Sequence, residues 1–147
     1  MEVNILHLYP DCMSLYGEWA NAAVLARQLE NLGAKVTVRR LLLDETPDFS
    51  DADFIYMGAG TERTQKAALM ALKDHAGALR AALDRGAGAL FTGSAMEILG
   101  KSVTDARGRE WPGLGLADYT STESDRREPE DVIAHSPLWD APAVGFM

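Results

Sequence analysis

The chain has 147 residues, of which 47% are apolar, so it is long and apolar enough to bury a hydrophobic core. Twenty-two acidic and 14 basic residues give a net charge of -8, which disfavours binding to nucleic acid phosphates. No apolar run reaches the about 20 residues that span a bilayer, no basic and apolar leader opens the chain, and the single Cys12 cannot form an internal disulfide. We therefore expect a cytoplasmic protein that binds neither nucleic acid nor a membrane.

The first two predicted elements are a strand and a helix. Residues 3–9 form an apolar run that ends at Pro10-Asp11, which predicts a strand followed by a loop. Residues 17–32 carry apolar side chains at intervals of three and four, and Gly33 follows them. This pattern is typical of an amphipathic helix that ends at a glycine.

Two further strands are predicted over residues 34–43 and 52–57, and we interpret Arg39-Arg40 as the solvated end of the first rather than as a basic patch. Residues 63–85 predict a helix, with Gly77 as the point at which it divides. A fourth strand then leads to Gly93. Strands that alternate with helices predict an α/β fold, doubly wound and flavodoxin-like, with a mostly parallel sheet.

The pattern changes after Gly100. Residues 101–111 are polar, and residues 114–122, 131–134 and 141–147 predict short strands with no helices between them. We expect these strands to form an antiparallel extension packed on the parallel sheet. The chain stops within the last of them, so we expect residues 1–147 to be a single domain that lacks its C-terminal part.

Three loops are expected to meet at the carboxyl edge of the sheet, where open parallel sheets bind ligands: residues 9–17, 58–64 and 92–96. In the second, Gly58-Ala59-Gly60 exposes backbone N–H groups that suit an anion or oxyanion, although a plain tight turn is the alternative. A third glycine or a Gly-Lys-Ser/Thr sequence, which nucleotide-binding loops need, is absent.

The third loop resembles a nucleophile elbow, a sharp strand-to-helix turn that displays a reactive side chain. Its tip is Gly93, which has no side chain and cannot attack a substrate. The turn is therefore either a binding notch lined by backbone or an elbow that has lost its chemistry.

Several motifs together resemble one family, the cobyric acid synthase-like (CobB/CobQ-like) class I glutamine amidotransferases, and especially its glutaminase subunits in cell-wall precursor amidation. The resemblance covers nearly the whole chain. Its most specific part is Tyr9-Pro10-Asp11 followed by Leu15-Tyr16-Gly17-Glu18, and Gly58 to Gln65 and Gly93 to Gly100 support it.

The resemblance implies a glutaminase that passes ammonia to a partner synthetase, with a cysteine nucleophile, an activating histidine and an oxyanion loop. Aligned without gaps, the nucleophile position is Gly93, the oxyanion loop is Gly58-Ala59-Gly60, and Glu97 replaces the usual glutamine. The position of the catalytic histidine falls beyond Phe146. We therefore expect a catalytically impaired domain, a pseudoenzyme, with no metal and no cofactor. The residues expected to bind substrate are Gly58, Ala59, Gly60, Ser94 and Glu97.

Other side chains are weaker candidates for the missing chemistry. Ser94 is interpreted as the N-cap of a short helix rather than as a nucleophile, and Cys12 as a small half-buried side chain. His7 is interpreted as a satisfied core residue, while His75 and His135 lack partners at metal-ligand spacing.

Three functions follow from these patterns. The first is an impaired glutaminase domain that serves a synthetase. The second is a non-catalytic module that binds glutamine or a related small ligand, or a synthetase. The third, a flavodoxin-like nucleotide binder, is disfavoured because the loop after the first strand is poor in Ser, Thr and Gly.

Overall fold

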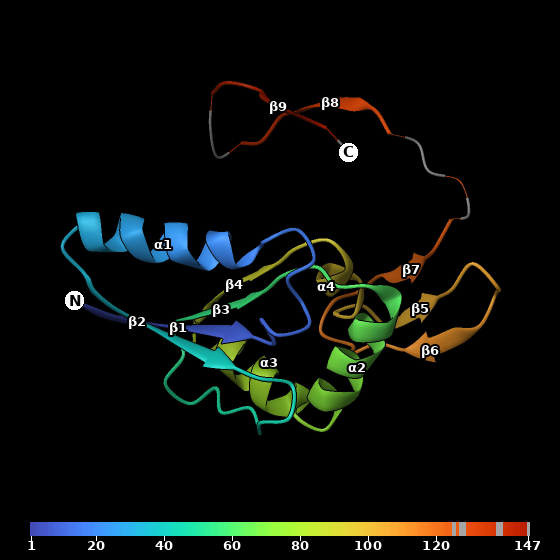
Figure 1. Cartoon of the computed structure of the whole chain (residues 1–147), viewed down its shortest axis with the longest axis horizontal. Helices are drawn as coiled ribbons and strands as arrows, with labels where there is room; N and C mark the ends of the chain where they lie inside the picture. Colours follow the sequence, from blue (N-terminus) through green and yellow to red (C-terminus); the bar gives the residue numbers. More distant parts are fainter. Residues whose placement is uncertain (125, 127–128, 138–139, 147) are drawn as a thin grey trace.

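The computed structural model describes residues 1–124, 126, 129–137 and 140–146 (Figure 1). A four-stranded sheet lies at its centre in the order β2-β1-β3-β4, with every neighbouring pair parallel. The chain passes from β1 to β2 on one side and then to β3 on the other, which confirms the doubly wound α/β fold. The strands are β1 (Glu2–Leu8), β2 (Lys35–Leu41), β3 (Phe54–Met57) and β4 (Gly88–Phe91).

Helices cover both faces of this sheet. Helix α1 (Trp19–Asn31) lies on one face, and α2 (Glu62–Lys73) and α3 (Ala76–Asp84) lie on the other (Figure 1). The second half of β1, residues 5–8, is buried on both faces, as a central parallel strand should be. The core on the α2–α3 side is formed by Leu6, Leu8, Ile55, Met57, Leu69, Leu72 and Leu79, all less than 5% exposed.

The predicted helix over residues 63–85 is two helices, as anticipated, but the division does not fall at Gly77. Helix α2 ends before Asp74, and His75 is the N-cap of α3. Gly77 lies within the first turn of α3. Asp and His both have low helix propensity, and a glycine costs little where the first N–H groups have no helical partner, so the break falls at Asp74-His75.

The segment after Gly100 differs from the sequence prediction. Strands β5 (Ser102–Thr104) and β6 (Glu110–Pro112) lie in the part expected to be a polar connection, and β7 (Thr120–Thr122) is much shorter than predicted. Their sheet has the order β6-β5-β7 and is mixed, because β5 is antiparallel to β6 and parallel to β7.

A backbone contact explains the short strand β7. The N–H groups of Gly113, Leu114 and Leu116 donate to the carbonyl groups of residues 101, 98 and 99. This stretch is therefore bound to residues 98–101 rather than paired along a longer strand. A Cβ atom at Gly113 would lie 2.3 Å from the carbonyl oxygen of Gly100, so the close approach requires glycine.

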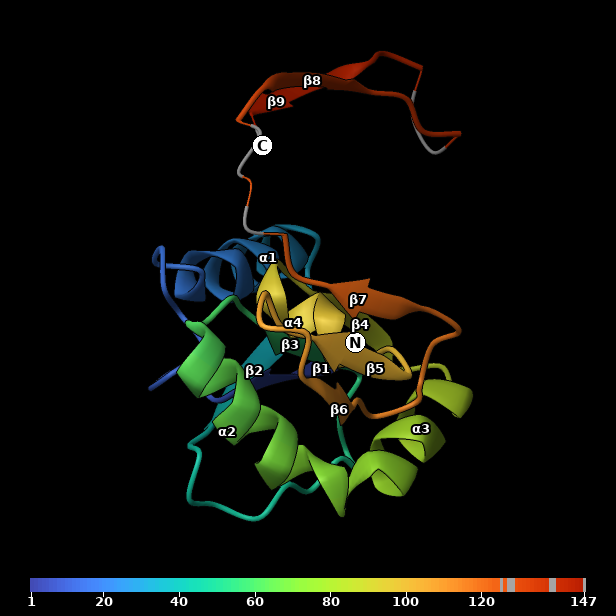
Figure 2. The ribbon, with the colours of Figure 1, turned by 90° about the vertical axis from the view of Figure 1, so that its right-hand side faces the viewer.

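Strands β8 (Asp131–Ala134) and β9 (Ala143–Phe146) form a separate antiparallel hairpin. The two strands exist as predicted, but they do not pack on the parallel sheet: both views show the hairpin standing away from the rest of the chain (Figures 1 and 2). The described helices include none that is both long and apolar enough to cross a membrane.

Candidate functional site

The three predicted loops meet at the carboxyl edge of the sheet. The N–H of Leu15, in the loop after β1, donates to the carbonyl of Ala59 at 3.0 Å. The loop after β3 is in turn bound to the turn after β4, because the Gly60 N–H donates to Ser94 Oγ at 2.9 Å. These contacts bring together residues that are more than 30 positions apart in the sequence.

The turn after β4 has the shape of a nucleophile elbow. Gly93 connects β4 to the short helix α4 (Ser94–Glu97) with φ 54° and ψ −130°, in a region that favours glycine. A Cβ atom at this position would lie 2.9 Å from the Cβ of Ala59, too close for an unaltered neighbour. The elbow backbone is present, but its tip has no side chain and little room for one.

Ser94 does not cap α4, contrary to the prediction. Gly93 is the N-cap, and Ser94 is the first helical residue. The Ser94 hydroxyl accepts a hydrogen bond from the Gly60 N–H and donates one to the Gly60 carbonyl, each at 2.9 Å. The hydroxyl points across to the neighbouring loop, where the Gly60 backbone offers both a donor and an acceptor.

Two backbone donors of the loop Gly58-Ala59-Gly60, those of Ala59 and Gly60, are already engaged within the chain. The Ala59 N–H donates to the Glu18 carboxylate at 3.1 Å, and the Gly60 N–H donates to Ser94. The loop therefore has anion-binding geometry, and the chain's own Glu18 and Ser94 supply the acceptors.

Both glycines of this loop are closely packed against their neighbours. A Cβ atom at Gly58 would lie 2.6 Å from the carbonyl oxygen of Met13 and 2.8 Å from the Cβ of Glu18. At Gly60 it would lie 2.4 Å from Thr64 Oγ1. The tight-turn interpretation thus accounts for the two glycines without a ligand.

Glu97 is held by a residue that carried no assigned role in the sequence analysis. The side-chain amide of Gln65 is 3% exposed and donates to Glu97 Oε2 at 2.7 Å and to the Ser94 carbonyl at 2.8 Å. Gln65 is the last residue of the motif that begins at Gly58 and lies near the start of α2. Its place in that motif was the only sequence signal for a role of this side chain. It joins α2 to the elbow helix.

A cavity of about 190 Å³ opens beside these groups. It is lined by carboxylates, by Gln65 and Ser94, and by the apolar surfaces of β5 and β6. Among the described residues that line it, none is Lys or Arg, so the cavity is acidic. Its lining residues are Gly60, Glu62, Gln65, Ser94, Glu97, Val103, Trp111 and Glu123.

Comparison with known proteins identifies the family of this chain. The family model for the CobB/CobQ-like glutamine amidotransferase domain matches residues 4–146. The chain belongs to this family. The match covers the loop, the elbow and the short strands that follow them.

Two curated relatives of this glutamine amidotransferase-like chain are both named lipid II isoglutaminyl synthase (glutamine-hydrolyzing) subunit GatD. The protein from Staphylococcus aureus is 27% identical over 145 residues, which are 99% of this chain and 59% of the relative. The protein from Streptococcus pneumoniae is 27% identical over 146 residues, 99% of this chain and 56% of the relative. The chain thus spans less than two thirds of the length of either relative.

The surroundings of Cys12 disfavour it as a nucleophile. It is half-buried, as predicted, and burial together with the nearby Asp11 raises the pKa of its thiol to about 11. A thiol with that pKa is almost entirely protonated at neutral pH and is a poor nucleophile.

His7 is a core residue, as predicted, but it is not fully satisfied. Its ring is 1% exposed and packs on Tyr56 at 5.0 Å between ring centroids, and its Nε2 atom has no hydrogen-bond partner among the described residues. Burial, with a contribution from Arg40, lowers its pKa to about 4. His7 is therefore neutral at pH 7 and buried in the sheet. His135 lies in a loop, and His75 is the N-cap of α3.

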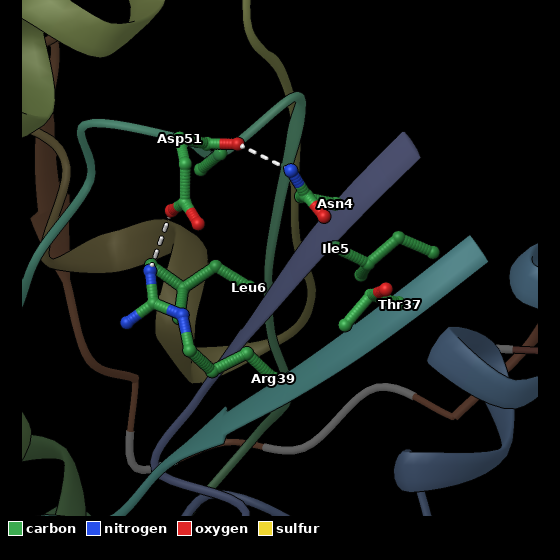
Figure 3. Close-up of a pocket in the computed structure, with 7 residues that line it drawn as sticks. Asn4, Ile5, Leu6, Thr37, Arg39 and Asp51 are labelled. Atoms are coloured by element: carbon green, nitrogen blue, oxygen red, sulfur yellow. Dashed lines mark hydrogen bonds and ion pairs between the residues drawn. The ribbon is translucent and has the colours of Figure 1, made fainter. Parts of the chain in front are cut away.

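Arg39 is not free to form a basic patch with Arg40, because its charge is paired within the chain. The Arg39 guanidinium donates to the Asp48 carbonyl at 2.6 Å and to the Asp51 carboxylate at 2.9 Å. Asn4 Nδ2 donates to the Asp51 carbonyl beside a cavity of about 50 Å³ (Figure 3). These contacts tie the loop before β3 to β1 and β2.

Proposed function

We propose that this chain is a glutamine amidotransferase-like domain, spanning residues 1–147, that does not hydrolyse glutamine. The observation that carries the proposal is Gly93. Covalent amide hydrolysis needs a nucleophile at the tip of the elbow, and this tip has neither a side chain nor space beside Ala59 for one. Losing an activated nucleophile typically removes many orders of magnitude of rate.

The state of the oxyanion loop supports the same proposal. An oxyanion hole works through donors that are free to meet the developing charge. Here the Ala59 and Gly60 N–H groups already bond to Glu18 and Ser94. Hydrolysis would need these bonds to break as well as a new nucleophile.

A second candidate function is binding of a small ligand at the elbow, and the acidic cavity favours it. Gly58, Ala59, Gly60, Ser94 and Glu97 are the proposed ligand-binding residues. Glu97 and its neighbours offer oxygen acceptors, which suit the amide or ammonium donors of glutamine or a related molecule. No metal and no cofactor are part of the proposal.

The names of the relatives suggest a partner. Each is called a subunit of a glutamine-hydrolysing synthase. We propose that this chain also associates with a synthetase-type subunit, in the cytoplasm, and contributes binding rather than ammonia. Co-purification with the corresponding synthetase subunit of the same organism tests the association.

Ammonia release from glutamine tests the central proposal. We expect the purified chain to release no more ammonia than a heat-denatured control. Turnover above that control would overturn the proposal, and Ser94→Ala and Cys12→Ser variants would then identify the nucleophile. Isothermal titration with glutamine tests the second function separately, with Glu97→Ala as the variant expected to weaken any binding.

A further inference from the structure

The acidic cavity beside the elbow lies between two parts of the chain. One wall comes from the loop after β3, from α2 and from α4, and the other from β5, β6 and Glu123, which follows β7. Figures 1 and 2 both show the short strands beside α2 and α4. The Glu123 N–H donates to the Thr104 carbonyl at 2.8 Å, which holds Glu123 beside β5. Glu97 of α4 and Glu123 therefore reach the cavity from different walls.

The three carboxylates of the cavity are not equally neutralised. Glu62 pairs with the Lys66 ammonium at 2.6 Å. Glu97 accepts from the neutral amide of Gln65, and Glu123 accepts from a backbone N–H at 3.1 Å. Neither of these two carboxylates forms an ion pair with a described residue. Two negative charges thus border the cavity without a cation from the described chain.

A buried acceptor also faces this cavity. The Gln65 side chain is 3% exposed, and its Nε2 donates to two acceptors, which fixes which end of the amide is the oxygen. The Oε1 atom accepts no hydrogen bond from the described residues, and it is not among the fully enclosed atoms that lack a partner. Because Gln65 lines the cavity, the open space beside Oε1 is the cavity itself. This oxygen needs a donor from a ligand.

The wall of the cavity already binds one ammonium group of the chain. Lys66 Nζ lies 4.0 Å from the Trp111 ring centroid and 2.6 Å from the Glu62 carboxylate. Trp111 and Glu62 line the cavity, whereas Lys66 lines the groove on the other side of Trp111. An aromatic ring beside a carboxylate is a favourable setting for an ammonium. Val103 adds an aliphatic surface to the same wall.

We propose that this cavity binds a short aliphatic diamine. One ammonium group lies at Gln65 Oε1 and the Glu97 carboxylate, the other lies at the Glu123 carboxylate, and the carbon chain lies against Val103 and Trp111. An ammonium group has three donors and no acceptor, so it matches a site whose free polar atoms are acceptors. A cavity of about 190 Å³ holds a chain of only a few carbon atoms. The proposal rests on the second function above, ligand binding at the elbow, and names the class of that ligand.

An amino acid such as glutamine fits this cavity less well. Its carboxylate would lie near Glu97 and Glu123, where like charges repel it. An adjoining cavity contains Arg107 and Arg109. Arg109 already donates to the Asp105 carboxylate at 2.8 Å, which leaves the exposed Arg107 as the counter-ion for a carboxylate there. A ligand with two ammonium groups and no carboxylate avoids this repulsion.

Isothermal titration with 1,4-diaminobutane, butylamine and glutamine, at neutral pH and low ionic strength, tests the proposal. We expect the diamine to bind at least about tenfold more tightly than either of the others. Glu97→Gln and Glu123→Gln keep the size of the side chain, and each should weaken diamine binding about tenfold. Glu110→Gln removes the same charge from an exposed position on β6 outside the cavity, and it is the matched control. An equal loss in Glu110→Gln would assign the binding to the general negative charge and overturn the proposal.

The remaining outcomes separate this inference from ligand binding in general. If glutamine binds and the diamine does not, the ligand class is wrong while ligand binding at the elbow stands. If neither binds, both fail. NMR of the side-chain amide of Gln65 locates the site, because its resonances should shift and saturate as the diamine is added. Binding heat without a shift at Gln65 would place the diamine elsewhere and overturn the proposal.

Discussion

Two strand-to-helix turns lie side by side at the sheet edge and are built in different ways. The turn from β3 leads into α2, a helix of 12 residues whose N-cap Thr61 accepts a hydrogen bond from the Thr64 N–H. The turn from β4 leads into α4, a helix of four residues with no side-chain cap. The first is shaped by packing against Met13 and Glu18, whereas the second depends on one glycine at positive φ.

The difference shows that two turns at one sheet edge can take their shapes from different contacts. The second turn has the backbone of an elbow with Gly93 at its tip. The first has the shape of an anion notch, in which Glu18 and Ser94 accept from the Ala59 and Gly60 N–H groups. Ser94 joins the two turns, so their geometry is held by hydrogen bonds that need no substrate.

The largest effect is expected from adding a methyl group at the second turn. Gly93→Ala should lower the free energy of unfolding by about 4 kcal/mol, because it combines backbone strain at positive φ with a contact of 2.9 Å to the Ala59 Cβ. Urea denaturation followed by circular dichroism measures the change. Gly77→Ala, within α3 and with no atom within 4 Å of the added Cβ, is the control and should not destabilise.

A second substitution separates the two causes. Ala59→Gly combined with Gly93→Ala removes the contact and leaves the strain, so it should recover about 1 kcal/mol relative to Gly93→Ala in the native background. Gly93→Ala with native stability would mean that the turn does not have elbow geometry.

At the first turn, Gly58→Ala should cost about 3 kcal/mol. The added Cβ would meet the carbonyl oxygen of Met13 at 2.6 Å and the Glu18 Cβ at 2.8 Å, and the backbone oxygen cannot move without shifting the loop. The same denaturation experiment measures the loss. A cost close to that of Gly77→Ala would show that the loop after β1 moves easily. The first turn would then not be shaped by packing against Met13 and Glu18.

Local sequence patterns predict much of this fold, whereas the remaining features depend on contacts between residues that are far apart in the sequence. The apolar runs of β1 and β3 predict buried strands, and a strand, a glycine and a short helical pattern predict the elbow at Gly93. The Ser94 hydroxyl instead bonds to Gly60, 34 residues away, which no spacing shows. The same holds for Glu18 and Ala59, 41 residues apart.

The sequence also did not predict the short strands β5 and β6, for a physical reason. Strand β5 has only three residues, Ser102 to Thr104, and β6 includes a proline. Three residues are too few to show an alternating pattern. The glycines at 100 and 113 make close backbone contacts beside these strands, and such contacts appear only in three dimensions.

The sheet beneath the first turn gives a pH-dependent test. Tyr56 of β3 packs on His7, whose pKa is lowered to about 4 by burial and by Arg40, against 6.5 in the unfolded chain. The unfolded state therefore binds a proton first as the pH falls. Stability is complete above pH 6.5 and is lost as the pH falls from 6.5 toward 4, by about 2 kcal/mol between pH 7 and pH 5.

Urea denaturation at pH 7, 6 and 5 measures this loss. His7→Phe keeps an aromatic ring beside Tyr56 and removes the titrating group, so its stability should change less over the same range. An equal loss in the native chain and in His7→Phe would assign the pH dependence to other groups, and the burial of His7 would not govern it.

The smallest effect is expected at the contact between the two turns. Ser94→Ala removes a hydroxyl that both accepts from the Gly60 N–H and donates to the Gly60 carbonyl, and should cost about 1 kcal/mol. Ser14→Ala, which loses an exposed bond of 3.3 Å to the Trp19 N–H, is the control and should cost less. Amide NMR shifts sharpen the result: the Gly60 resonance should move in Ser94→Ala, while that of Ala59, bonded to Glu18, should move less. Unchanged Gly60 and Ala59 resonances would show that the turns do not depend on this hydroxyl, and that each holds its shape without the other.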